Sequence, residues 1–345
     1  MNTVLRSAAL PIAATLLAFL ALAAALFTAL GQPPLQTLGA LVVFAVGDAY
    51  SLSQTLAKTT PILLCALAAA VPGRLGLISV GAEGQLHAGA IGGTAMVLLA
   101  PALPGPLLLP LMLLGAALGG AIYGYIPGLL RARLDVNETI TTLLMNYITV
   151  MLVAALVFGP WRDPASQGWP ATIQFPANAV LPSLPGTRIH LGLLLGVVAA
   201  VALHIYFNHG RWAEKVRILA GNRKVGETFG LSFGFWVIIL MSVGGALAGL
   251  AGIAEVSVIQ GRLQQSISLG YGLTGFLVAW LSRHQPLIIL PVSLCVGGLV
   301  AGSDALQLFA KVPAASAVIL QGLLFAAALG IPGLLNRWRK HADER

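Results

Sequence analysis

The sequence predicts an all-α, polytopic integral membrane protein with about ten transmembrane helices and both termini on the cytoplasmic side. Of its 345 residues, 58% are hydrophobic and only 9% are Asp, Glu, Lys or Arg, whereas charged residues make up roughly 25% of an average soluble domain. Its 40 glycines are typical of closely packed membrane helices. This composition excludes a soluble enzyme, a disordered protein and a nucleic-acid binder.

The expected spans are runs without charge, because about 20 consecutive apolar residues cross a bilayer as a helix. In chain order these runs are 7–30, 55–73, 76–100, 107–130, 139–160, 189–208, 230–254, 267–282, 286–303 and 313–335. A shorter apolar segment, 35–52, contains Asp48 and is expected to be an interfacial or re-entrant helix. The first apolar stretch, at about 24 residues, exceeds that of a signal peptide, so we expect an uncleaved span. Residues 1–345 then form a single transmembrane domain.

The distribution of positive charge supports this topology. Ten spans place both termini on one side, and 14 of the 19 Lys and Arg residues fall on that side. The positive-inside rule makes it the cytoplasmic face. Spans 2–5 and 7–10 enter the membrane from opposite sides, which permits an inverted repeat of the two halves.

The outer loop 160–188 carries six prolines and two tryptophans. Proline restricts such a loop to extended and turn conformations. The loop is therefore either a stiff connector or a lid or docking surface for an external partner.

The inner segment 209–230 is rich in charge and longer than a connector needs to be. Its pattern predicts a short helix over 211–219, a stop at Gly221, a helix N-cap at Asn222 and a second short helix ending near Gly230. A compact, charged, helical insertion suits docking to a soluble partner. A solvated basic loop that follows the positive-inside rule is the alternative.

The first polar cluster within the membrane contains Glu83 and Gln85. A charge near the bilayer centre costs at least roughly 2.5–3.5 kcal/mol, so such residues usually face a bundle interior or a cavity. Glu83 lies nine residues past Arg74, which is about 13 Å deep if the segment is helical. The flanking Gly81 and Gly84 permit close packing or local unwinding, and transporters commonly build polar sites from unwound backbone. A buried hydrogen-bond network that pins two helices is the alternative.

The second cluster begins at Asn137 and Glu138, which are typical of a helix start at the inner interface. Thr142 and Asn146 then belong to one polar stripe at helical spacing. Asn146 lies eight residues past Glu138, about 12 Å along a helix. It can therefore share a depth with Glu83 and line the same pathway, unless the stripe serves only helix packing.

The third polar position is Glu255, at the outer end of the seventh expected span, where it either lines the pathway or anchors the helix at the interface. The sequence contains no G-x-x-x-x-G-K-[ST] phosphate loop and no catalytic acid pair. Cys65 and Cys295 give neither a metal spacing nor a disulfide framework. We therefore expect no cofactor, no metal and no enzymatic activity, and any ATPase is expected on a separate chain.

Three motifs resemble those of one protein family, in the same order and at matching spans. The segment LGLISVGAEGQLHAGAIGG is similar to the family's N-I-G-x-E-G-Q stretch, with Ser79 in place of its Asn. The segment DVNETITTLLMNYI is similar to its V-N-E-V…M-N-Y-I stretch, and RWAEKVRILAGNRKVGETFGL to its coupling segment, with Val225-Gly226 in place of paired alanines. The chain thus resembles the permease subunits of bacterial ABC importers of the branched-chain amino acid, simple-sugar and nucleoside group, with the nucleoside and simple-sugar branch favoured.

The resemblance implies a subunit in the bacterial inner membrane that moves a nucleoside or simple sugar by alternating access. It implies a second permease subunit, often a different homologous chain, two cytoplasmic ATPase subunits and an extracytoplasmic solute-binding protein as partners. Segment 209–230 would be the ATPase coupling segment, with Arg211, Glu214, Arg217, Asn222, Arg223 and Gly230 as candidate contacts. The candidate pathway residues are Glu83, Gln85, Thr142, Asn146 and Glu255.

Four alternatives remain open at this point. The chain could be a proton-coupled secondary transporter with Glu83 as the proton carrier, or an ABC permease for branched-chain amino acids. An integral-membrane enzyme would need a catalytic acid or metal cluster at one interface, which the sequence does not show. A purely structural scaffold would leave Glu83 and Asn146 without a purpose.

Overall fold

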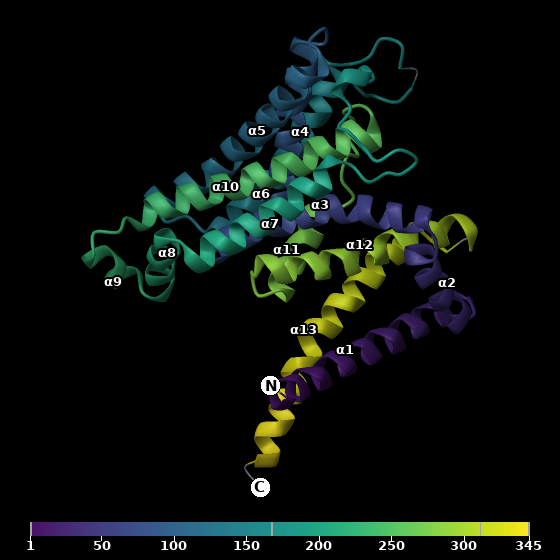
Figure 1. Ribbon diagram of the computed structural model, residues 1–345, viewed down its shortest axis with the longest axis vertical. Helices are drawn as coiled ribbons and strands as arrows, with labels where there is room; N and C mark the ends of the chain where they lie inside the picture. The colour runs from purple at the N-terminus through teal and green to yellow at the C-terminus, as the bar shows by residue number, and fades with distance from the viewer. Residues whose placement is uncertain (1, 167, 311, 344–345) are drawn as a thin grey trace. The chain divides into compact units, whose positions relative to one another are not determined.

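The computed structural model describes residues 2–343 other than 167 and 311, with side chains over 13–334, and regular secondary structure in this part is helical (Figure 1). In chain order the helices are α1 (Asn2–Ala29), α2 (Pro34–Val46), α3 (Ala49–Gly73), α4 (Ala82–Leu99), α5 (Gly105–Leu134), α6 (Glu138–Phe158), η1 (Ala177–Ala179), α7 (Leu191–His209), α8 (Arg211–Gly221), α9 (Arg223–Thr228), α10 (Phe233–Ala254), η2 (Glu255–Gln260), α11 (Tyr271–Leu281), α12 (Pro286–Phe309) and α13 (Ala315–Asp343). The all-α prediction is confirmed for these residues.

Fewer helices than the ten expected are both long enough and apolar enough to cross a membrane. Among the described residues, seven helices are long and apolar enough to cross a membrane, or eight if the bent pair α1–α2 counts as one span. The other two expected spans correspond to α4 and α11. Helix α11 has only 11 residues, and α4 begins six residues later than expected, at Ala82. The ten-span count and the cytoplasmic placement of the termini therefore stay predictions.

The boundary near residue 47 differs from the expected one. Segment 35–52 was expected to form one interfacial or re-entrant helix, but the structure divides it between α2 and the first turn of α3. Asp48 is the physical reason, because its carboxylate accepts a hydrogen bond from the Ser51 N–H at 2.6 Å, as a helix N-cap does. That hydrogen bond also lowers the pKa of Asp48. Helix α2 meets α1 at a 114° bend, in line with a re-entrant turn or a broken span.

The chain divides into two compact units, of which the first comprises Met1–Lys58 and Cys295–Arg345. Within this unit α1 packs against α13 and α2, around a core that includes Phe27 and Leu320. Lys58 and Asp304 form an ion pair at 2.9 Å, so that the two opposite charges neutralise each other.

The second unit, Thr59–Leu294, is built around α4, α5 and α10, which pack side by side (Figure 1). Glycines hold the three backbones in contact. A Cβ added at Gly249 of α10 would lie 2.2 Å from the Ala116 carbonyl oxygen of α5, and one at Gly252 would lie 2.0 Å from that of Leu86 in α4. Such backbone contact is possible only where a side chain is missing, which accounts for the glycine content of these helices.

The two ends of this unit differ in character. At one end the loop 160–190 is fastened to its surroundings: Asn178 donates hydrogen bonds to the carbonyls of Pro101 and Leu103, and Ser257 bonds the backbone of Ala179 and Leu181. At the other end α8 packs against α7 and α9, and Arg223 of α9 lies 4.0 Å from Asp135, the C-cap of α5. The predicted pair of short helices in 209–230 is confirmed, although α8 continues to Gly221.

Candidate functional site at two short helices

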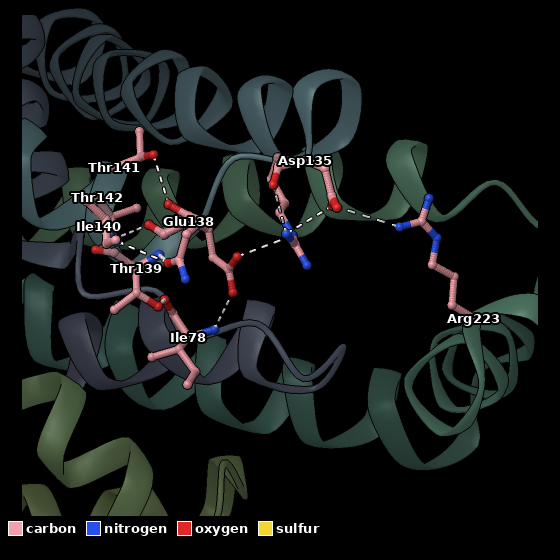
Figure 2. Close-up of polar contacts among 10 residues, drawn as sticks. Ile78, Asp135, Glu138, Thr139, Ile140, Thr141, Thr142 and Arg223 are labelled. Atoms are coloured by element: carbon pink, nitrogen blue, oxygen red, sulfur yellow. Dashed lines mark hydrogen bonds and ion pairs between the residues drawn. The ribbon is translucent and has the colours of Figure 1, made fainter.

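A non-helical segment, residues 75–81, precedes α4 where the sequence had predicted helix: turns at 75–76 and 81 flank residues 77–80, and we call it the extended segment. Its backbone cannot bond within a helix, and side chains of α6 take over that role. Glu138 Oε1 accepts from the Ile78 N–H at 3.1 Å, and Thr139 donates to the Ile78 carbonyl at 2.9 Å (Figure 2). Thr142 accepts from the Val80 N–H at 3.2 Å, and the Asn146 amide donates to the Val80 carbonyl at 2.9 Å.

Asn146 also serves the helix that follows this segment. Its Oδ1 accepts from the Gly84 N–H, in the first turn of α4, at 2.8 Å. The side chain is thus an N-cap supplied by another helix, and it satisfies one of the four N–H groups that a helix start leaves open. Both polar atoms of the buried Asn146 amide therefore bond backbone. The polar stripe holds the unwound chain in place, and Asn146 and Thr142 contact protein in this conformation.

Glu83, in the first turn of α4, reaches the start of the second short helix, α11. Its Oε2 accepts from the Gly272 N–H at 2.6 Å, so a carboxylate lies at a helix N-terminus, where negative charge is favoured. The backbones touch here as well, because a Cβ at Gly272 would lie 2.1 Å from the Glu83 nitrogen. Oε1, the other carboxylate oxygen, has no hydrogen-bond partner in the described part of the chain, and the side chain is only half-buried.

Gln85 and Glu255 take different places. Gln85 is buried two residues further along α4, and its amide nitrogen lies against Gly81 and Gly124, 3.3 Å from where a Cβ on either glycine would be. Glu255 is 4% exposed as the first residue of the π-helical turn η2, and Gln260 donates to its carboxylate at 3.5 Å. The structure thus brings Glu83, Gln85 and Asn146 together at the start of α4, while Glu255 belongs to a second polar cluster.

Asn137 and Glu138 form the start of α6, as predicted. The Asn137 side chain accepts from the Thr139 and Ile140 N–H groups at 2.9 and 3.2 Å, which is the geometry of an N-cap. Glu138 is 8% exposed and its Oε2 pairs with Arg131 Nε at 3.3 Å. The partner role of Arg131 was missed from sequence, although its spacing to Glu138 across a three-residue loop was available as a signal.

The candidate coupling segment packs through one face and leaves its charges outside. Ala213, Val216 and Leu219 are buried along one side of α8, and the last two belong to a core with Phe207 and Trp236. The opposite face is exposed and presents Arg211, Glu214 and Arg217. This amphipathic helix is therefore attached firmly to the helical bundle while its charged face stays accessible.

Asn222 joins the two short helices. It is the C-cap of α8 and the N-cap of α9, where its side chain accepts from the Lys224 and Val225 N–H groups. Gly230 closes the segment with a φ of +76°, a conformation that glycine adopts without steric cost. The predicted roles of Asn222 as N-cap and Gly230 as helix end are confirmed.

The charged face of α8 is electrostatically one-sided near Arg217. Burial, together with the positive charge of Arg217, lowers the pKa of the Arg74 guanidinium. Burial and the positive charge of Arg74 likewise lower the pKa of His284. Arg74 and Arg217 therefore place two positive charges in this region, which favours a partner of negative charge.

Helices long enough to cross a membrane, packed through glycines around two short helices, define a multi-pass membrane protein. A family model described as "branched-chain amino acid transport system / permease component" matches residues 51–329. The chain belongs to this ABC permease family, whose members are transport components rather than enzymes.

Three relatives are matched over most of their length. The chain is 33% identical to the glucose ABC transporter permease protein TsgB13 of Haloferax volcanii, over 90% of this chain and 84% of the relative. It is 29% identical to the nucleoside ABC transporter permease protein NupB of Lactococcus lactis, over 95% and 93%. It is 31% identical to the guanosine ABC transporter permease protein NupP of Bacillus subtilis, over 82% of each.

A solved structure shares the fold at low sequence identity. It is titled "PsaBC from Streptococcus pneumoniae in complex with Fab", and it covers 84% of this chain and 95% of its own with a TM-score of 0.50 and 11% identity. The similarity supports the arrangement of the helices and says nothing of the solute.

Proposed function

We propose that this chain forms the translocation pathway of an ATP-driven importer for a small polar solute, either a nucleoside or a simple sugar. Relatives named for glucose, nucleosides and guanosine support this class of solute. In this proposal the chain works in the cytoplasmic membrane with a second permease subunit, two cytoplasmic ATPase subunits and an extracytoplasmic solute-binding protein.

The meeting of two helix N-termini at Glu83 is the observation that carries the proposal. Each N-terminus contributes partial positive charge and N–H donors, and the half-buried carboxylate has one oxygen, Oε1, without a protein partner among the described residues. A carboxylate oxygen accepts hydrogen bonds from hydroxyl and N–H groups, which nucleosides and sugars offer in number. Transporters commonly place discontinuous helices of this kind at the solute site.

The positions of the two short helices in the chain add support. In the expected inverted repeat of spans 2–5 and 7–10, α4 and α11 are the second members of their halves. Short or interrupted segments at corresponding positions of two repeats point to the binding site in transporters. In this proposal Gln85, two residues after Glu83, lines the same pathway, and Asn146 and Thr142 position the unwound backbone beside it.

The α8–α9 segment would be the ATPase docking surface. Its apolar side is packed on the bundle and its charged side, with Arg211, Glu214 and Arg217, is exposed. The outer loop 160–188 lies at the opposite end of the second unit, where a binding protein would deliver solute. ATP binding would then move α8 and α9, and the pathway would open to one side at a time.

Reconstitution tests the proposal. The permease would be placed in proteoliposomes with the ATPase, second permease and binding protein encoded by neighbouring genes, and uptake of labelled nucleosides, sugars and branched-chain amino acids measured with and without ATP. We expect ATP-dependent uptake of a nucleoside or a sugar, together with solute-stimulated ATP hydrolysis. Stimulation by branched-chain amino acids alone would refute the solute class, and a lack of stimulation by any solute would refute the function.

A Glu83→Gln variant separates this function from proton-coupled transport. The amide keeps an acceptor oxygen for the Gly272 N–H and for solute, but it cannot carry a proton. An ATP-driven importer should retain ATP-dependent uptake with weakened solute binding, and an uncoupler should not affect it. Complete loss of accumulation with intact solute exchange would indicate a proton carrier, and Glu83→Ala should impair transport or assembly in either case.

A further inference from the structure

The α8–α9 segment is joined to the extended segment 75–81 by a continuous series of charged contacts. The series starts on α9, where Arg223 Nη1 lies 4.0 Å from Asp135 Oδ1 (Figure 2). Asp135 also pairs with Arg131 Nη1, at the end of α5, at 3.0 Å. Its carboxylate is therefore shared by two guanidinium groups from different helices.

The series continues from Arg131 into the start of α4. Arg131 Nε forms an ion pair with Glu138 Oε2 at 3.3 Å, without the geometry of a hydrogen bond, while the other oxygen of Glu138 accepts from the Ile78 N–H at 3.1 Å. Ile78 belongs to the extended segment that ends at α4, whose first turn carries Glu83. Every group from Asp135 to Ile78 thus has a partner on each side.

The contacts differ in how firmly they are held. The side chains of Arg131 and Glu138 are 27% and 11% exposed, so their charges are poorly screened and the pair holds the ends of α5 and α6 together. Arg223 and Asp135 are 53% and 73% exposed and 4.0 Å apart, and an exposed pair at that distance breaks and re-forms at little cost. The pair between α9 and Asp135 is the movable contact of the series.

Two local features keep Arg223 and Asp135 near each other. Arg223 is oriented by an ion pair with Glu227 at 2.8 Å and by the Phe233 ring, 4.7 Å from its guanidinium carbon. Asp135 has a left-handed backbone with φ 52°, which costs energy for a non-glycine residue but is tolerated best by Asp and Asn. Its conformation is stabilised by Arg131, which also donates to the Asp135 carbonyl at 3.3 Å.

We infer that Asp135 and Arg131 are positioning residues that transmit displacement of α9 to segment 75–81, and so set where Glu83 lies relative to α11. The inference rests on the proposed function, because it assigns the docked ATPase as the source of that displacement. When α9 approaches Asp135, the carboxylate is drawn toward Arg223, and Arg131 is freed to bind Glu138 more strongly. When α9 withdraws, Asp135 returns to Arg131 and competes with Glu138 for its guanidinium.

The main test is the number of solute molecules taken up per ATP hydrolysed in the reconstituted complex. Asp135→Asn tolerates the left-handed backbone and removes the charge, and Arg223→Gln removes the other side of the movable pair. Each should lower uptake per ATP about three- to tenfold, the range of coupling changes seen along such networks. The double variant should be no worse than either single variant, because both interrupt the same contact.

Matched controls lie on the same turns. Arg133→Gln removes an exposed positive charge two residues from Arg131, and Lys224→Gln removes one next to Arg223. Both should leave uptake per ATP unchanged, and Arg223→Lys should restore part of it by restoring the charge. Equal losses in Arg133→Gln and Asp135→Asn would overturn the inference, because general surface charge would then account for the effect.

A second measurement needs no ATPase. Amide hydrogen exchange of the peptide covering 75–81 in the purified permease should change at least about threefold in Asp135→Asn and not in Arg133→Gln. Equal exchange in the two variants would overturn the inference even if transport fell. A wild-type complex that does not link uptake to ATP hydrolysis would refute the proposed function instead. The exchange measurement alone would then test whether Asp135 acts on segment 75–81.

Discussion

Replacing Gly249 by Ala provides a sharp test of the packing between α10 and α5. The new Cβ would lie 2.2 Å from the Ala116 carbonyl oxygen and 3.2 Å from the Gly120 Cα, whereas ordinary contact begins at 3.4 Å. The carbonyl and the Cβ must therefore separate by about 1.2 Å. Neither atom is at the end of a flexible side chain, so the two helix backbones have to move apart.

The free-energy cost of Gly249→Ala depends on how closely α10 is packed against its neighbours. On the α4 side, Gly249 Cα is only 2.1 Å from where a Cβ on Gly89 would be, so α10 is in contact with two helices at one residue. Overpacking of this kind costs about 1–3 kcal/mol, and the better helix propensity of Ala recovers less than 1 kcal/mol. We expect a net loss of about 1–2 kcal/mol in the free energy of unfolding, which lowers the Tm of a chain of this length by about 1–3 °C.

Thermal unfolding in detergent can be followed through Cys65, which is fully buried. A thiol-reactive fluorophore should label it only when the packing opens, in a Cys295→Ser background that removes the exposed thiol. Gly322→Ala is the matched control, because a Cβ there meets nothing within 4 Å. If Gly249→Ala and Gly322→Ala unfold at the same temperature, the three-helix contact is looser than the glycine geometry requires.

Three further predictions concern other parts of the second unit. His190 caps α7 by accepting a hydrogen bond from the Gly192 N–H at 3.1 Å, and burial lowers its pKa from 6.5 to about 4. The contribution of neutral His190 to the free energy of unfolding should be fully present above pH 6.5 and fall by up to about 3 kcal/mol as the pH drops to 4. His190→Asn should flatten that slope when unfolding is measured against pH. Arg217→Glu should relieve the repulsion at Arg74 and leave the Tm unchanged or higher while solute-stimulated ATP hydrolysis is lost; intact stimulation would mean that α8 is only a connector. Asn222→Ala should destabilise the α8–α9 junction by about 1 kcal/mol and speed limited proteolysis there, whereas Asn222→Ser should preserve the cap.

Most helices of the second unit follow from local information. The bounds of α6 and α10 lie close to the charge-free runs 139–160 and 230–254, because uncharged apolar length alone requires a helix in a membrane. Asn137 and Asn222 could be recognised as caps because a capping side chain bonds backbone only two or three residues away. These features depend on neighbours in sequence, so they were predictable.

The unwound segment 75–81 depends on residues about 60 positions later. Its sequence, LGLISVG, is apolar enough to continue a helix. Gly76, with a φ of +82°, ends the preceding helix, and the acceptors and donors on α6 hold the residues that follow. The surroundings of Glu255 depend on distant residues in the same way, because Ala179 and Leu181 of the loop 160–190 bond Ser257, two residues further along η2. Sequence spacing along a single helix contains neither fact.

The single residue between α8 and α9 has a consequence for how the segment can respond to a docked partner. Asn222 ends one helix and starts the next, so no linker separates the face of α8 proposed to dock the ATPase from the arginine that faces Asp135. A displacement of α8 is therefore expected to rotate α9 as well, because no linker lies between the two helices to take up the movement. Inserting two glycines after Gly221 would leave every charge of the segment present and yet uncouple one helix from the other, which distinguishes rigidity from charge as the property that matters.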